Sequence, residues 1–120
     1  MKKILLLAVL LTFMISTVVD ARVKVKGLGD KMNFDPDSVP AAFKPSFEMM
    51  TIKCIKCHTM ERTVIAIQTG RAPITGQPFD KQAVKAYGIK MLRKPNSDMN
   101  KQEIRDIVKL LSFFLEENEK

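Results

Sequence analysis

The only two cysteines and the only histidine of this 120-residue chain lie together, in Cys54-Ile55-Lys56-Cys57-His58. Two cysteines separated by two residues and followed at once by histidine are typical of covalent c-type haem attachment. The spacing places two thiols along one porphyrin edge, where they can add to the vinyl groups, and places an imidazole under the iron. We therefore predict one haem c, joined by thioethers to Cys54 and Cys57 and ligated on its proximal side by His58.

Three other readings of the two cysteines compete with this prediction. A thiol–disulfide redox pair usually accompanies a βαβ pattern, which the sequence lacks. A zinc site takes about four protein ligands, and a second Cys/His pair is absent. A simple surface disulfide is the third reading. We favour haem attachment over all three because the N-terminus predicts export.

Residues 1–21 have the features of a secretory signal peptide. Lys2 and Lys3 precede an apolar run from Ile4, and Val19-Asp20-Ala21 supplies a small residue for cleavage. The apolar run is shorter than the roughly 20 residues that a spanning helix needs, so we expect cleavage rather than an uncleaved anchor. The mature chain should then have no stable membrane span.

The rest of the chain predicts a small all-α domain of about four helices, with long loops around the haem. Residues 22–44 form an irregular arm that glycines and prolines interrupt, and 45–120 form the domain. A first helix begins near Pro45 and leads into the cysteine motif. A second covers 61–68 and ends at Gly70, and a loop runs to Phe79.

Two more helices follow this loop. Asp80 is an N-cap for a third helix that runs to about Arg93, where 94–97 interrupts it. Asn100 and Glu103 form a capping box at the start of the last helix. Its apolar residues recur at helical spacing and predict a packing face, made by Ile104, Ile107, Val108, Leu111 and Leu115.

Methionine is the candidate for the distal side of the iron, since its thioether is a ligand of cytochromes c and no second histidine exists. We predict Met91, with Met99 as the runner-up because it already precedes a helix cap. The other methionines fit less well. Met1 and Met14 are lost with the signal peptide, and Met60 is too near His58. Met49 and Met50 are expected in the core, and Met32 is remote. On the proximal side, the 70–79 loop could offer a backbone carbonyl to His58, with Pro73 considered first.

The formal net charge of +7 falls to +6 when the signal peptide removes two lysines and one aspartate. A basic surface of this kind is typical of a protein steered toward an acidic partner. Nucleic acid is disfavoured as a partner, because the chain has one tyrosine, no tryptophan and no recognisable binding motif.

Residues 54–117 resemble a small monohaem cytochrome c of the class I type, and are similar to short periplasmic cytochromes of metal-reducing bacteria. The resemblance rests on 54–62, on 90–97 and on the capped last helix. It implies a periplasmic location and, since a methionine before a Lys-Pro-Gly-Ser-like stretch faces the iron in such proteins, it favours Met91. The front of the chain departs from the family, whose clear N-terminal helix crosses the C-terminal one.

The resulting functional hypothesis is a monomeric single-electron carrier, not an enzyme, with other redox proteins as partners. Lysines near the haem edge would orient an acidic partner, and we name Lys53, Lys56, Lys90 and Lys94. A first alternative is a haem enzyme or gas sensor with an open axial position, for which the distal candidates are Arg62, Arg71 and Arg93. A second alternative is a small haem subunit of a larger redox complex, anchored by Phe34, Phe43, Phe113 and Phe114.

Overall fold

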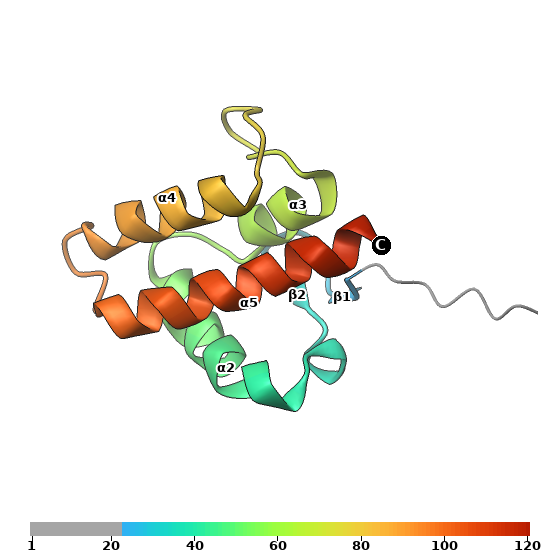
Figure 1. Ribbon diagram of the computed structural model, residues 1–120, viewed down its shortest axis with the longest axis horizontal. Coiled ribbons are helices and arrows are strands. Elements are labelled where there is room, and N and C mark those ends of the chain that lie inside the picture. The colour runs from blue at the N-terminus through green and yellow to red at the C-terminus, as the bar shows by residue number, and fades with distance from the viewer. Residues whose placement is uncertain (1–22) are drawn as a thin grey trace, which may run out of the picture.

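The computed structural model describes residues 23–120, which are mostly helical and carry one small antiparallel sheet (Figure 1). Its α-helices are α2 (Lys44–Lys53), α3 (Glu61–Thr69), α4 (Lys81–Leu92) and α5 (Lys101–Glu119). Strands β1 (Val25–Lys26) and β2 (Asn33–Phe34) pair with Val25 opposite Phe34. The expected helical domain is therefore present, and the prediction of an all-α chain is corrected by this hairpin.

The predicted signal peptide, 1–21, lies outside the described residues. From 23 to 120, the chain has no helix that combines the length and the apolar character needed to cross a bilayer.

The helix boundaries follow the local signals in the sequence. The Asp80 carboxylate accepts a hydrogen bond from the backbone N–H of Ala83 at 2.8 Å, as an N-cap should. Asn100 and Glu103 form the predicted capping box, because the Asn100 side chain accepts from the Glu103 N–H and the Glu103 carboxylate accepts from the Asn100 N–H. Gly70 ends α3 in the left-handed conformation, with φ at 66°.

A tight turn separates α4 from α5 and explains why α4 stops. Pro95 takes its second position, Asn96 its third with φ at 62°, and the Ser97 N–H donates to the Lys94 carbonyl at 3.2 Å. Proline followed by a residue of positive φ is the arrangement of a type II turn, and asparagine tolerates that conformation better than most residues. Two residues later, Asp98 is left-handed as well, with φ at 53°.

The segment before α2 contributes to the core instead of lying loosely over it. It contains the hairpin and three short 3₁₀ turns, Gly29–Lys31, Pro36–Ser38 and Ala41–Phe43. Phe34 is fully buried, and its ring stacks on that of Phe114 in α5 with 4.3 Å between centroids. Since both rings are enclosed, two of the four phenylalanines considered as anchors for a larger complex are not available to a partner.

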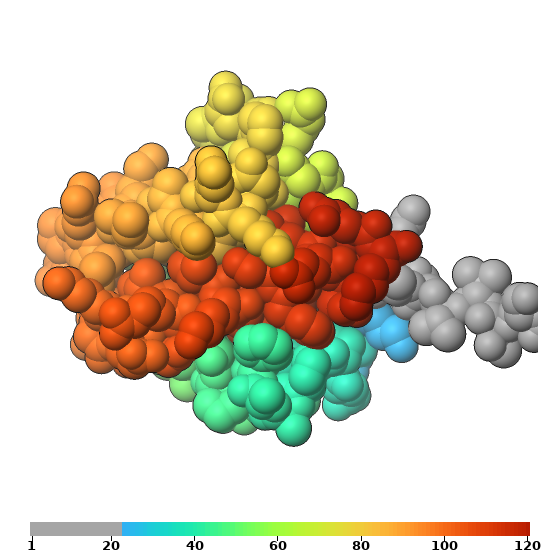
Figure 2. All heavy atoms as spheres, in the orientation of Figure 1, coloured from blue at the N-terminus to red at the C-terminus, as the bar shows by residue number. Residues whose placement is uncertain are grey.

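Helices α4 and α5 lie side by side along one face of the molecule (Figure 2). Gly88 is buried where they meet, and a Cβ atom at this position would lie 3.0 Å from Val108 Cγ2 and 3.1 Å from Ile104 Cγ2. These methyl groups belong to β-branched side chains, which are stiff about χ1. The absence of a side chain at Gly88 therefore sets how closely the two helices approach.

We expect Gly88→Leu to lower the free energy of unfolding by about 1–3 kcal/mol, the usual cost of overpacking. Denaturant unfolding of the purified protein measures the change. Ala86→Leu is the control, because Ala86 is exposed on the same helix and surface changes usually stay within about 0.5 kcal/mol. Equal stability of the two variants would show that the approach of α4 to α5 is not limited at Gly88.

Candidate haem-attachment site

An apolar cavity of about 450 Å³ lies beside the Cys-x-x-Cys-His motif. Ligand pockets typically have volumes of about 300–1,000 Å³ and mainly apolar linings with a few polar groups. Side chains reach this cavity from α3, α4, α5, the 70–79 loop and the turn after α2. The apolar lining residues from these elements are Ala66, Ala72, Pro73, Ile74, Phe79, Val84, Tyr87, Ile104, Ile107, Val108 and Leu111.

The cysteine motif begins directly after α2, in a 3₁₀ turn formed by Cys54–Lys56. Cys54, Cys57 and His58 all line the cavity, and both cysteines are free thiols. Cys54 is half-buried, whereas Cys57 is exposed. Burial raises the pKa of the Cys54 thiol to about 11, because the thiolate loses hydration there.

This difference predicts the order in which the thiols react in haem-free protein. The thiolate is the nucleophile, and a raised pKa means a smaller thiolate fraction at a given pH. Iodoacetamide should therefore modify Cys57 before Cys54, and the Cys54 rate should keep rising until the pH passes about 11. Peptide mass spectrometry measures both rates, with urea-unfolded protein as the control. Equal rates without urea would mean that the turn at 54–58 does not bury Cys54 in the folded protein.

The His58 ring is oriented by a neighbouring backbone group. Its Nδ1 lies 2.8 Å from the carbonyl oxygen of Thr59, so a proton on Nδ1 would be donated to that oxygen. That tautomer leaves Nε2 free as a metal ligand. The structure thus places Thr59, not Pro73, at the position considered for the partner of His58. Pro73 instead lines the cavity.

The structure brings both predicted distal candidates to the cavity. Met91, in the last turn of α4, and Met99, just before the cap of α5, each line it. Four other methionines of residues 23–120 pack in or against the core and do not line it: Met32, Met49, Met50 and Met60. Two thioethers can therefore face a group held between the cysteine motif and α4.

The four lysines proposed to orient a partner have different surroundings. Lys53 and Lys56 are paired within the chain, with Glu103 and Asp98 respectively. Lys90 lies over the Tyr87 ring, 5.4 Å from its centroid, and Lys94 is exposed at the cavity. The acidic partners of Lys53 and Lys56 could not be found from the sequence, because they follow 42 or more residues later in the chain.

The three arginines considered for an open iron are also separated. Arg62 lines the cavity, whereas Arg71 donates from its guanidinium to the Gly76 carbonyl at 2.9 Å. Arg93 is exposed and is not a lining residue.

Comparison with known proteins does not identify a family for this chain. No family model, curated protein or solved structure matches the chain. Within residues 23–120, no three His, Cys, Asp or Glu side chains are grouped so that they could hold a metal ion. The site is thus defined by its own residues: two thiols, one imidazole and two thioethers around an apolar cavity.

Proposed function

We propose that this chain is a periplasmic monohaem c-type cytochrome that carries single electrons between redox proteins. One observation supports this proposal above all: a single apolar cavity is lined together by Cys54, Cys57, His58, Met91 and Met99. A covalently attached haem c with His/Met ligation uses such a set, with thiols for its edge, nitrogen and sulfur for its metal and apolar side chains for its faces.

Each group has a distinct role in this proposal. Cys54 and Cys57 would hold the haem covalently, His58 would bind its iron through Nε2, and Met91, or alternatively Met99, would supply a second iron ligand. The haem, when bound, supplies one-electron ferric/ferrous chemistry. With His58 and a methionine both bound to the iron, the chain would leave no coordination site for a substrate, so the proposal is a carrier and not an enzyme.

The cavity lining tunes this chemistry. Phe79, Val84 and Ile107 are each less than a tenth exposed, so they exclude water from the wall that they form. A dry surrounding and a thioether ligand both favour the less charged, reduced iron. We propose a small class I-type cytochrome fold for this domain. A chain of this size buries little apolar surface on its own, so a haem in the cavity would also stabilise the fold.

Partner docking is assigned to Lys90 and Lys94, because Lys53 and Lys56 are paired within the chain. Both assigned lysines are exposed and line the cavity, so they lie where an electron would leave the site. An acidic redox partner would be attracted to them, and the rate of electron exchange should fall as salt is added.

The proposal is tested by secreting the full chain in a bacterium that attaches haem c. We expect a protein with one haem added to its intact mass, low-spin spectra in both oxidation states and a weak far-red methionine-to-iron band in the ferric form. The ferrous form should not bind carbon monoxide at neutral pH. A colourless product with the mass of bare protein would refute the proposal.

Each of the two alternatives predicts a different result in this experiment. Rapid binding by the native ferrous form would indicate an open axial position, and Arg62 would then be the distal group to examine, because it lines the cavity. A haem protein that is recovered only within a larger assembly would favour the subunit alternative, with Phe43 and Phe113 as its anchors, since these two are only partly buried.

A further inference from the structure

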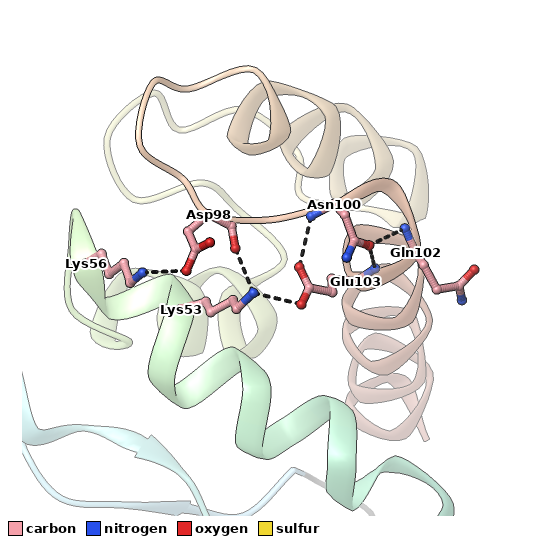
Figure 3. Close-up of polar contacts among 6 residues, drawn as sticks. All are labelled: Lys53, Lys56, Asp98, Asn100, Gln102 and Glu103. Atoms are coloured by element: carbon pink, nitrogen blue, oxygen red, sulfur yellow. Dashed lines mark hydrogen bonds and ion pairs between the residues drawn. The ribbon is translucent and has the colours of Figure 1, made fainter.

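Two lysines of the cysteine motif region reach across to the segment that joins α4 and α5, residues 93–100 (Figure 3). Lys53 Nζ donates to the backbone carbonyl of Asp98 at 2.7 Å and to Glu103 Oε1 at 2.7 Å. Lys56 Nζ donates to Asp98 Oδ2 at 3.1 Å. Asp98 therefore accepts from both lysines, one through its backbone and one through its side chain.

The segment held in this way adjoins one distal candidate and contains the other. It begins two residues after Met91, which lies in the last turn of α4, and it contains Met99; Ser97 and Met99, on either side of Asp98, line the cavity. The lysines belong to the opposite side, since Lys53 immediately precedes Cys54 and Lys56 lies between the two cysteines. The contacts thus join the proximal attachment turn to the methionine-bearing segment.

The backbone of Asp98 has a conformation that these contacts can help to hold. Its φ of 53° is left-handed, a conformation that costs most residues about 1–2 kcal/mol, although Asp and Asn adopt it more readily.

The two ion pairs of the lysines differ in how exposed their side chains are. Lys53 and Glu103 are 22% exposed, whereas Lys56 and Asp98 are 43% and 71% exposed. Hydrogen bonds from the two lysines lower the pKa of both Glu103 and Asp98, so both carboxylates are charged at neutral pH.

We propose that Lys53, Lys56 and Asp98 form a clamp that holds the 93–100 segment against the attachment turn. The segment contains Met99 and continues directly from the end of α4 that carries Met91, so the clamp keeps the distal methionine in place, whichever of the two it is. Asp98 is a positioning residue in this proposal, since it acts through the segment and touches neither haem nor partner. The inference rests on the proposed function, because it assumes a methionine ligand. The clamp also gives Lys53 and Lys56 a role within the chain, in place of the role in partner docking that their position suggested.

Exchange of the distal ligand tests the clamp. Imidazole can bind ferric iron only after methionine leaves it, so its binding rate reports how often the end of α4 and the 93–100 segment move away from the attachment turn. We expect Asp98→Asn to raise this rate about two- to fivefold, the range for loss of an exposed ion pair. Asparagine retains the tolerance for positive φ, so the variant removes the charge and leaves the backbone preference. Lys56→Gln should have the same effect, and the double variant should add little to either.

The matched control is Asp37→Asn. It makes the same substitution in a similarly exposed ion pair, Lys26 Nζ to Asp37 Oδ2 at 3.3 Å, in the N-terminal segment, and should leave the imidazole rate unchanged. Added salt should accelerate imidazole binding to the unsubstituted protein but not to the double variant. The assay is run at about pH 8, where imidazole is mostly uncharged and its approach is insensitive to salt.

Hydrogen exchange gives a second measurement that does not depend on ligand exchange. Amides of residues 93–100 should exchange faster in haem-loaded Asp98→Asn protein than in the Asp37→Asn control, with little change elsewhere. Unchanged imidazole rates in both Asp98→Asn and Lys56→Gln would overturn the clamp, as would faster exchange in the segment without faster imidazole binding. Failure of the proposed function looks different, because the unsubstituted protein would then lack haem or the far-red band.

Discussion

Replacing both cysteines, Cys54→Ser with Cys57→Ser, should abolish covalent haem attachment completely. Serine hydroxyls are much weaker nucleophiles than cysteine thiols and do not add to the haem vinyl groups, so no covalent link remains. The intact mass after extraction with acidified acetone should be that of bare polypeptide, whereas the unsubstituted protein should retain the mass of one haem. Each single variant keeps one thiol and should give a reduced yield of attached haem.

The same double variant should also fold poorly. The cavity of about 450 Å³ is lined by apolar side chains from most of the domain, and without a covalent link the proposed haem would be lost from it more easily. Thermal unfolding should show a large decrease in stability. Ile55→Ser is the matched control, because it places serine in the same turn at a residue that is 53% exposed. Extraction-resistant haem in the double cysteine variant would contradict the assignment of the two thiols.

Substitution of Met91 should have the second-largest effect. We expect Met91→Ala to lose the far-red band, to become high-spin in the ferric form and to bind carbon monoxide in the ferrous form, because the sixth position opens. Its reduction potential should fall, since axial ligands set haem potentials over about 0.8 V. Met99→Ala should keep the band and the potential close to those of the unsubstituted protein.

A third methionine provides the control for these variants. Met60 is 3% exposed and packs in the core without lining the cavity, so Met60→Leu should keep the band and cost less than about 1.5 kcal/mol of stability. Loss of the band in Met99→Ala alone would exchange the roles of Met91 and Met99. Retention of the band in both alanine variants would refute both assignments and direct attention to other sulfur ligands.

Features that depend on neighbouring residues could be predicted from the sequence. The caps at Asp80 and Asn100 and the end of α3 at Gly70 rest on hydrogen bonds or backbone conformations within three or four residues. The motif at 54–58 is equally local, since one turn of chain carries two thiols and an imidazole. For such features, residues that are close in the sequence are also close in the folded structure, so the sequence alone is sufficient to predict them.

The burial of individual residues on the packing face of α5 could be predicted only in part. Ile104, Ile107 and Leu115 are buried as the helical spacing predicts. The same spacing places Val108 and Leu111 on this face, but they are only partly buried, although Ile104 and Ile107 line the same cavity. Periodicity identifies the apolar face, but it does not show how deeply each side chain is buried or which of them line a cavity.

By itself, then, the sequence determined the order of the helices, their caps and the residue types available for haem attachment. Only the tertiary structure decided that Met91 and Met99 reach the same cavity as the cysteine motif. It also decided that the 23–44 segment packs on α5 and that Asp98 accepts from Lys53 and Lys56. These contacts join residues more than 30 positions apart, and their formation depends on how whole helices pack, which no local pattern encodes.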